Sequence, residues 1–531
     1  MMGNVIHEDP AGSVSEAAYQ AVTQHIDSQG GNALLSRSAT LVVAASDASA
    51  NSKAGADYVC DGIADDVEIQ AAVGALAIGG KTLLSEGTFT TTAAINFGVS
   101  NVVLEGQGAS TVVKAGAAID LFTCTAGINN VTIKNLKLDG NAIGTRGINF
   151  SQIDDLRVES IEVDDFATDG IRLAGTPNRR IWIESCHFNK TPIQIRLAPT
   201  GAGHRQYRIL NNAFNAWTTY AISLEGAPPG DLDSIHLVGN VFQLDTAATA
   251  SNAINMSTDI WLVVEKFITN NLFHHTSPGT ADGSWVDVYG SHIFLLSNVI
   301  DSSGFHAAII GKAGKANGEG YIAFNNFVNT CRKTQGQAIL MTECDWMRII
   351  GNHFNLGVGK TDKGIYMDTC NYCTIEGNIV AGITTGIAGA IELADTTECQ
   401  IIGNLCRNNS GYGVLESGTA NYNTVQSNSL RNNTTGALSV SGANTKVMDN
   451  IGYVTENSGT ATVANGQTTV TVTHGLATTP TRVQATPTLL SNAASFWVTA
   501  KGATTFVINV NADPGAGTAA FDWRAVVGEG N

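Results

Sequence analysis

The sequence is poor in proline, charge and aromatic residues, and it contains no long hydrophobic run. Only 10 prolines interrupt 531 residues, whereas there are 57 glycines, and charged residues make up 14% of the chain. No stretch of about 18 apolar residues occurs, so no membrane-spanning helix is expected. Residues 1–12 are polar and lack the apolar core of a secretory signal. This composition predicts a turn-rich globular protein that is made in the cytoplasm and reaches the outside without a signal peptide.

Basic residues are also scarce, because the formal net charge is -17. Binding to a nucleic acid backbone requires basic patches that release counterions, so nucleic acid is not an expected partner. Nine cysteines in a chain of this length do not suggest a disulfide scaffold. Cys370 and Cys373 have no second ligand pair at zinc-site spacing, so we expect no metal and no cofactor. The cysteines instead predict buried thiols.

An asparagine recurs once every 24 to 31 residues through most of the chain, usually two residues before an apolar position. Such a period is typical of a solenoid in which structural repeats stack on one another. A side-chain amide in a turn can bond to the same amide one coil away, so we interpret these residues as structural. The asparagines are Asn212, Asn240, Asn271, Asn298, Asn325, Asn352, Asn378, Asn404 and Asn428.

Each repeat contains three short apolar runs with alternating polarity, as in 171–173, 222–224 and 391–393. A period of two predicts strands, and three strands per repeat of about 25 residues predict one turn of a parallel β-helix. The same register begins earlier, at Leu136, Ile161 and Cys186. The predicted fold is therefore all-β: a right-handed, single-stranded parallel β-helix of at least about twelve coils.

The two ends of the chain follow different patterns. Residues 1–40 include a helical pattern over 13–26, which we interpret as an attachment or oligomerisation segment. The β-helix is expected over 41–455, with a capping helix near 64–76 whose first turn carries Asp65 and Asp66. Six β-rich runs separated by glycine turns follow, and they predict a small antiparallel β-sandwich over 456–531 for trimerisation or carbohydrate binding.

Several motifs near the start of the repeats carry a family resemblance. They are the stretch 55–72, Gly79-Gly80, Ser85-Glu86-Gly87-Thr88-Phe89 and Leu104-Glu105-Gly106-Gln107-Gly108. Together they resemble the entry to pectate-lyase-like right-handed β-helix proteins. Adding the leading helical segment and the small terminal β-domain, the layout resembles a bacteriophage tailspike.

This resemblance implies a virion appendage that binds a host cell-surface polysaccharide and often cleaves it. It also implies a homotrimer of β-helices standing side by side, joined to the phage tail or baseplate through the N-terminus. The chain lacks the acidic signatures of polygalacturonase-type hydrolases, since Gly201-Ala202-Gly203-His204-Arg205 is only a partial match. The fold alone does not determine the chemistry.

Connections between the predicted strands lengthen between about 196 and 345, which predicts walls around a groove on the flank of the solenoid. Within and beside this window we predict catalytic residues Glu225, Asp282, Asp287 and His274. The predicted substrate-binding residues are Arg172, Arg196, His275, Trp285, Tyr289 and Glu343.

Two kinds of chemistry fit these residue types. Glycoside hydrolysis uses two carboxyl groups, which neighbouring coils or a single loop can supply. A polysaccharide lyase instead uses a base and a cation beside a uronate, for which the arginines and histidines are candidates. Trp285 and Tyr289 beside the acids favour stacking against sugars. The alternatives are a non-catalytic adhesion or structural spike and, less favoured, a cellular polysaccharide lyase.

Overall fold

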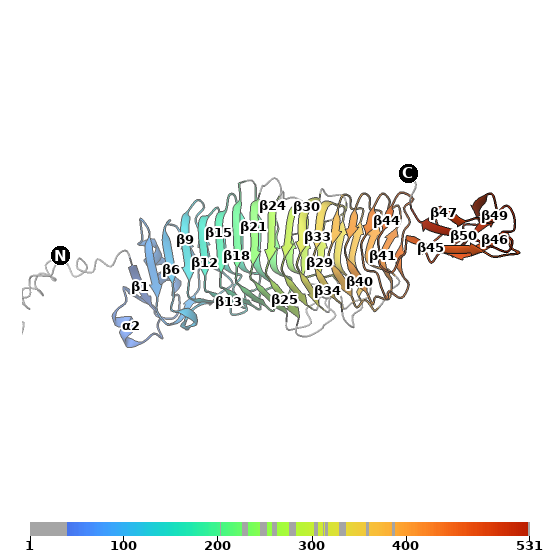
Figure 1. Ribbon diagram of the computed structural model, residues 1–531. Helices are drawn as coiled ribbons and strands as arrows, with labels where there is room; N and C mark the ends of the chain where they lie inside the picture. Colours follow the sequence, from blue (N-terminus) through green and yellow to red (C-terminus); the bar gives the residue numbers. More distant parts are fainter. Residues whose placement is uncertain are drawn as a thin grey trace, which may run out of the picture.

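The computed structural model describes residues 40–528 except 202, 226–231, 245–251, 257–262, 276–282, 302–305, 312, 314–316, 329–335, 357–360 and 385–387. The predicted helical segment over 1–40 therefore lies almost wholly outside the described residues. Figure 1 shows a long rod of stacked strands, followed at the C-terminal end by a small separate β-structure. Among the described residues, no helix is both long and apolar enough to cross a membrane.

The rod is a parallel β-helix whose coils each contribute one strand to three sheets. In chain order we call them sheet A, sheet B and sheet C. One coil, for example, runs through Ile193–Pro199 in sheet A, Arg205–Leu210 in sheet B and Ala213–Asn215 in sheet C. Because sheet C alone has 13 strands in the described part of the chain, the prediction of at least twelve coils is confirmed.

Sheet A contains β5 (Ile95–Phe97), β8 (Asp120–Cys124), β11 (Arg146–Ser151), β14 (Asp169–Gly175), β17 (Ile193–Pro199), β20 (Tyr220–Leu224), β23 (Asn252–Met256), β26 (Val286–Val288), β29 (Ala308–Ile310), β32 (Gly336–Thr342), β35 (Thr361–Asp368), β38 (Gly389–Ala394), β41 (Tyr412–Ser417) and β43 (Gly436–Ser439).

Sheet B contains β1 (Thr40–Ala44), β2 (Tyr58–Val59), β3 (Gly80–Leu84), β6 (Val102–Glu105), β9 (Asn129–Lys134), β12 (Asp154–Glu159), β15 (Arg179–Glu184), β18 (Arg205–Leu210), β21 (Leu232–Val238), β24 (Val263–Thr269), β27 (Ser291–Leu296), β30 (Asn317–Ala323), β33 (Cys344–Ile350), β36 (Thr374–Glu376), β39 (Gln400–Ile402), β42 (Thr424–Gln426) and β44 (Lys446–Met448).

Sheet C contains β4 (Gly87–Thr91), β7 (Thr111–Ala115), β10 (Lys137–Asp139), β13 (Glu162–Asp164), β16 (His187–Asn189), β19 (Ala213–Asn215), β22 (Val241–Leu244), β25 (Leu272–His275), β28 (Val299–Asp301), β31 (Asn326–Val328), β34 (His353–Asn355), β37 (Ile379–Ala381) and β40 (Leu405–Arg407). Three short helical elements precede the regular coils, namely α2 (Ala50–Ala54), α3 (Asp66–Gly74) and η1 (Gly108–Ser110).

Inward side chains stack in columns because like positions of successive coils pair in register. Phe188, Phe214, Phe242 and Phe273 form one such column, with ring centroids 4.7 to 5.0 Å apart and nearly parallel planes. This spacing follows from the ~4.8 Å separation of paired strands. The core is therefore continuous along the rod, as the alternating sequence pattern predicts.

The recurrent asparagines form a buried ladder at the corner between sheets B and C. The Oδ1 of Asn352 accepts hydrogen bonds from the backbone N and the Nδ2 of Asn325, at 3.0 and 2.9 Å. The Nδ2 of Asn352 donates to the carbonyl of Ile322 and to Oδ1 of Asn378. The same pattern runs from Asn212 to Asn428 and continues to Asn450. Their structural role is confirmed, because each amide satisfies backbone groups of the coil beside it.

The helix predicted near 64–76 is α3, which packs against the first strands of the rod. Asp65 and Asp66 stand at its start, as predicted, and their carboxylates also accept hydrogen bonds from backbone groups outside the helix. Asp65 accepts hydrogen bonds from the backbone N of Gly62 and Thr90, and Asp66 accepts one from Thr92. These carboxylates tie the helix to β4 and the residues after it.

The C-terminal β-structure consists of two three-stranded antiparallel sheets, ordered β45-β50-β47 and β46-β49-β48. A separate hydrophobic core includes Val463, Phe506, Ile508 and Phe521. The six predicted runs are therefore all strands: β45 (Glu456–Val463), β46 (Thr469–Thr473), β47 (Arg482–Leu489), β48 (Phe496–Thr499), β49 (Thr505–Val510) and β50 (Ala519–Val526).

One inward position of sheet B carries a charged residue that the alternating pattern does not explain. Lys266 pairs in register with Ile235 and Ile293 and is 1% exposed. Its Nζ donates to the carbonyl of Ser291 at 3.0 Å. Burial lowers the pKa of Lys266 from 10.5 to about 7, since the charged form loses hydration in the core.

Replacing Asn352 with alanine should destabilise the rod strongly. The change removes the acceptor of two buried donors on Asn325 and one donor to Ile322, and each such loss costs roughly 1–3 kcal/mol. Thermal unfolding followed by circular dichroism should show a clearly lower midpoint. Asn326→Ala, one residue from the ladder on the outer face of sheet C, is the matched control and should leave the midpoint almost unchanged.

The buried lysine predicts a specific pH dependence of stability. Between pH 7 and about 10.5 the unfolded chain binds a proton at Lys266 that the folded chain does not, so the free energy of unfolding should rise with pH there. Lys266→Met should increase stability at pH 7 and flatten this rise. Denaturation at a series of pH values measures both effects, and an unchanged slope in the variant would assign the dependence to other groups.

Candidate functional site

The outer face of sheet A carries a column of polar residues in the middle of the rod. Arg172, Arg196, Ser223, Asn255 and Asp287 pair in register on β14, β17, β20, β23 and β26. The alternation of their strands predicts outward positions for these five residues, and the structure aligns them in one row. Successive members are ~4.8 Å apart along the rod. Ser223 and Asn255, in the middle of the row, are buried, at 0% and 6% exposed.

Long connections join sheet A to its neighbours at both edges in this region. Between sheets C and A the strand bounds leave 245–251 and 276–285 as connections, and between sheets A and B they leave 225–231 and 257–262. Connections beside earlier strands are shorter, such as 190–192 between β16 and β17. The added residues therefore belong to the two edges of the face that carries the polar row.

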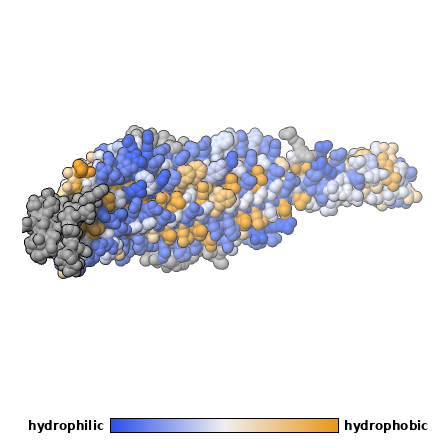
Figure 2. Space-filling view, turned by 60° about the vertical axis from the view of Figure 1, so that its left-hand side comes forward, coloured by the Kyte–Doolittle hydropathy of each residue, from blue (hydrophilic) through white to orange (hydrophobic). Residues whose placement is uncertain are grey.

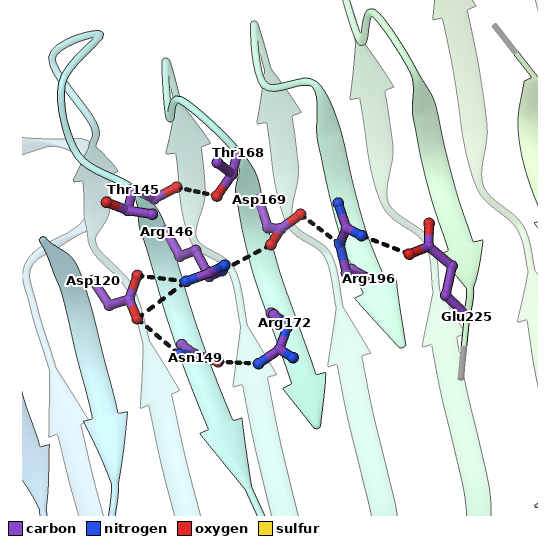
Figure 3. A network of polar contacts seen from close by, with 9 residues as sticks. All are labelled: Asp120, Thr145, Arg146, Asn149, Thr168, Asp169, Arg172, Arg196 and Glu225. Carbon is purple, nitrogen blue, oxygen red and sulfur yellow. Dashed lines mark hydrogen bonds and ion pairs between the residues drawn. The ribbon is translucent and has the colours of Figure 1, made fainter. Parts of the chain in front are cut away.

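Arg196 is the centre of an ion-pair network that crosses several coils (Figure 3). Its Nε donates to Oδ1 of Asp169 at 2.8 Å, and its Nη1 lies 2.5 Å from Oε2 of Glu225. Asp169 is 1% exposed and also binds Nε of Arg146 at 2.9 Å. Burial opposes the charge of Arg196, but hydrogen bonds and attraction to Asp169 and Glu225 outweigh it and raise the pKa of Arg196.

The carboxylate of Glu225 is fixed in place by hydrogen bonds from two protein side chains. Ser223 Oγ donates to its Oε1 at 2.7 Å, while Arg196 binds its Oε2. Both carboxylate oxygens therefore have protein partners. This geometry favours a role for Glu225 in orienting Arg196, and a role as a nucleophile or acid would require one partner to be released.

Asp287 lies two strands beyond Ser223 along the row. The Nδ2 of Asn252 donates to its Oδ2 at 3.3 Å, and Asn252 in turn accepts a hydrogen bond from the backbone N of Ser284 at 2.8 Å. Asp287 is partly exposed on β26. The side chain is thus oriented by a neighbouring amide on the same face.

Tyr220 on β20 is a further ionisable residue of this region, and the sequence analysis did not single it out. Burial, together with the negative charges of Glu225 and Asp287, raises the pKa of Tyr220 above its ordinary value of 10.0. The phenol is therefore neutral at physiological pH and can donate a proton or a hydrogen bond. Tyr220 is the first residue of β20 and pairs with Asn252; strict alternation from the inward Ile222 would have placed it in the core, which is why sequence reasoning missed it.

Four of the predicted site residues lie away from this row. His274 is on the outer face of sheet C, where its Nδ1 lies 3.0 Å from Oδ2 of Asp301. His275 is buried, at 7% exposed. Glu343 lies between β32 and β33, and Tyr289 follows β26 at the same edge of sheet A. His274 on β25 and Asp287 on β26 belong to sheets C and A, which face different directions, so the structure does not bring these two predicted catalytic residues together on one face. Asp282 lies outside the described residues.

Trp285 is a core residue, contrary to its expected place at an exposed loop tip. It is 5% exposed, lies 6.1 Å from Trp217 in an edge-to-face contact, and donates from Nε1 to the carbonyl of Asp301 at 3.1 Å. The ring closes the edge of the hydrophobic core where sheet C passes to sheet A. It cannot stack against a sugar in this position.

A second polar cluster lies further along the outer face of sheet A. Beyond Asp287, the row of outward residues on sheet A continues in register through Ile309, Leu340, Tyr366 and Glu392. Lys363 Nζ lies 3.5 Å from the ring centroid of Tyr366 and 3.2 Å from Oε1 of Glu392. Glu392 is 7% exposed, and its Oε2 is buried without a hydrogen-bond partner. Asp287 and Glu392 are four strand spacings apart, or roughly 19 Å.

The fold and this surface define a parallel β-helix with a polar face along its flank. One family model matches residues 297–474, described as periplasmic copper-binding protein (NosD). The matched stretch covers the later coils and the first strands of the C-terminal β-structure. No curated protein matches the sequence.

Among solved structures, the chain is similar to the tailspike of Escherichia coli bacteriophage HK620 in complex with a pentasaccharide. The identity is 12% and the TM-score 0.49, covering 88% of this chain and 90% of that one. The Dettilon tailspike matches with 14% identity and a TM-score of 0.37, covering 87% and 90%.

The A-module of the Azotobacter vinelandii mannuronan C-5 epimerase AlgE4 matches with 14% identity and a TM-score of 0.36, covering 73% of this chain and 96% of that one. The fold assignment itself rests on the strand pairing described above.

Trp285→Ala should destabilise the protein, because removing a buried tryptophan typically costs about 3–5 kcal/mol. Trp346→Ala is the matched control, since Trp346 is 59% exposed in a nearby coil. Comparison of the two unfolding midpoints checks the assignment. A larger loss for Trp346→Ala would contradict the core position of Trp285.

Proposed function

We propose that the protein is a tailspike-like virion appendage that binds a host surface polysaccharide along sheet A and depolymerises it. The observation that carries this proposal is the polar column on the outer face of sheet A, where Arg196 and Asp287 are joined in register through Ser223 and Asn255, and where Glu225 binds the arginine. A straight, rigid row of polar positions suits a polymer that passes along the rod. The HK620 tailspike, which is similar in fold, was solved with a pentasaccharide.

The two polar clusters on sheet A support a polymeric ligand rather than a small one. They are separated by roughly 19 Å along one straight face, with the apolar residues Ile309 and Leu340 between them. A chain of sugars can contact both clusters at once, and each contact adds to the binding free energy. The remaining parts of the proposal are a homotrimer and attachment to the tail through the N-terminal segment.

The proposed chemistry uses Asp287 and Tyr220 as the proton-transfer groups. A neutral phenol can protonate a leaving glycosidic oxygen, while a carboxylate can accept a proton from water or from the carbon beside a uronate. Arg196, whose charge is held by Asp169 and Glu225, would bind an anionic sugar substituent. This scheme serves either a hydrolase or a lyase.

A non-catalytic adhesion spike is the second candidate, favoured by the ion pairing of Glu225. Both oxygens of that carboxylate already have partners, so Glu225 is not a free acid in this arrangement. The periplasmic description of the family that matches 297–474 would instead fit a cellular protein, which has no phage partner.

Asp287→Asn and Tyr220→Phe should each lower turnover about 100-fold or more, in line with the usual contribution of general acid–base groups. Gel filtration of a panel of bacterial surface polysaccharides before and after incubation measures shortening. Both variants should unfold at nearly the wild-type midpoint. His274→Ala, on sheet C, is the control and should keep full activity.

Two other outcomes distinguish the candidates. A wild-type protein that binds a polysaccharide without shortening it would overturn the enzymatic proposal and support the adhesion spike. Loss of activity in His274→Ala, with both sheet A variants fully active, would move the site to sheet C.

A further inference from the structure

The corner where the chain passes from sheet A to sheet B carries exposed aromatic side chains in the later coils. The coils stay in register there, because consecutive parallel bridges join Asp345, Asn371, Thr397 and Asn421. The next position of each coil forms what we call the corner column, which consists of Trp346, Tyr372, Glu398 and Tyr422. Trp346 and Tyr422 are 59% exposed, and Tyr372 is 43% exposed. Hydrophobic patches occur among polar residues elsewhere on the rod (Figure 2), so exposure alone does not mark a site.

The backbone of the corner column makes these rings unusual. All four residues have a left-handed conformation, with φ between 56° and 59°, which bulky side chains rarely adopt. In earlier coils the same position, also at positive φ, carries the polar or charged residues Asn130, Asp155, Arg180, Gln206, His292 and Glu319. The fold therefore does not require aromatic rings at this corner, and their presence indicates a binding role.

The spacing of the rings leaves a gap of defined width. Because the backbone conformation is the same at each position, the side chains leave the rod in the same direction. Trp346 and Tyr372, on neighbouring coils, stack with centroids 4.6 Å apart at an interplanar angle of 14°. Tyr372 and Tyr422 are two coils apart, so their positions differ by roughly 10 Å along the rod. A group bound midway between them would lie roughly 5 Å from each ring.

The gap contains a carboxylate. Glu398 occupies the coil between the two tyrosines and is exposed, and none of the residues that the structure describes forms a salt bridge with it. Glu319, an earlier member of the same corner position, is instead paired with His292 at 3.0 Å. Asp395 lies three residues before Glu398, and hydrogen bonds from the backbone N and hydroxyl of Thr419 lower its pKa. Negative charge therefore gathers beside the gap.

Two ring positions and a carboxylate between them select the charge of the ligand. A cation is attracted to the face of an aromatic ring when it lies within about 6 Å of the ring centroid, and the midpoint of the gap meets this limit for both tyrosines. Glu398 adds an opposite charge at the same height. A neutral sugar would gain nothing from that charge, and an anionic group would be repelled by it. The arrangement thus suits an ammonium group.

We infer that Tyr372, Glu398 and Tyr422 form a binding site for an ammonium group of the glycan, the group carried by an unacetylated amino sugar. The site borders the proposed path of the polymer, because Glu398 belongs to the same coil as Glu392 of the second polar cluster on sheet A. The identification of the ligand as a glycan rests on the proposed function, whereas the selection of an ammonium group rests on the corner column alone.

Calorimetric titration of the full chain tests the inference. A glucosamine oligosaccharide with free amines should bind roughly ten-fold more tightly than its fully N-acetylated form. Tyr372→Ala, Tyr422→Ala and Glu398→Gln should each weaken binding of the free-amine form by about two- to five-fold, with unchanged circular dichroism spectra. Tyr372→Phe keeps the ring face and should bind as the wild type does. Glu319→Gln is the matched control, because it removes the same charge from the same corner position.

Equal affinity for the two oligosaccharides, or an equal loss in Glu319→Gln and Glu398→Gln, would overturn the inference. Choline serves as a second probe because it carries the cation without a sugar, and its binding should weaken in the same three variants. A protein that shortens a surface polysaccharide but binds neither choline nor the free-amine oligosaccharide would refute this site and leave the proposed function intact. Choline binding by a protein that neither binds nor shortens any polysaccharide would count against the proposed function alone.

Discussion

In-register pairing of each coil with the next is the interaction on which the whole molecule depends. This pairing places equivalent residues of successive coils directly above one another. A residue type that recurs at one position of the coil therefore forms a column along the rod. Columns of Phe fill the core, a column of Asn closes the corner between sheets B and C, and a column of polar residues marks sheet A. A one-residue slip would exchange inward and outward side chains and destroy all three at once. The asparagine ladder opposes such a slip because its amides are buried and fully used.

This regularity explains why the sequence predicts the fold so well. Two sequence patterns arise from the periodic contacts that the structure contains. One is the recurrence of Asn325 and Asn352, and the other is the alternation around Ile222 and Ile391. The row from Arg172 to Asp287 could be predicted for the same reason, since it follows from strand register alone. The six strands of the C-terminal β-structure were marked by their glycine turns.

Residues in the connections and at the ends of strands could not be placed in this way. Trp285 follows a connection whose path the period does not determine, and it turns inward to the core. His274 and Asp287 are close in sequence but belong to different sheets, because the chain changes direction between β25 and β26. Asp169 bridges two arginines on neighbouring coils, a pairing that depends on side-chain reach. Lys266 shows that even a strict alternation can include a charge inside the core.

The asparagine ladder has a consequence for how proteins of this design can change over time. Every amide presents the same acceptor to the coil before it and the same donors to the coil after it. The upper surface of one coil therefore matches the lower surface of any other. Duplication or deletion of an entire coil leaves all hydrogen bonds satisfied, whereas a shorter insertion must be accommodated in a connection. The length of the rod can thus evolve by whole steps of ~4.8 Å, independently of the chemistry displayed on its faces.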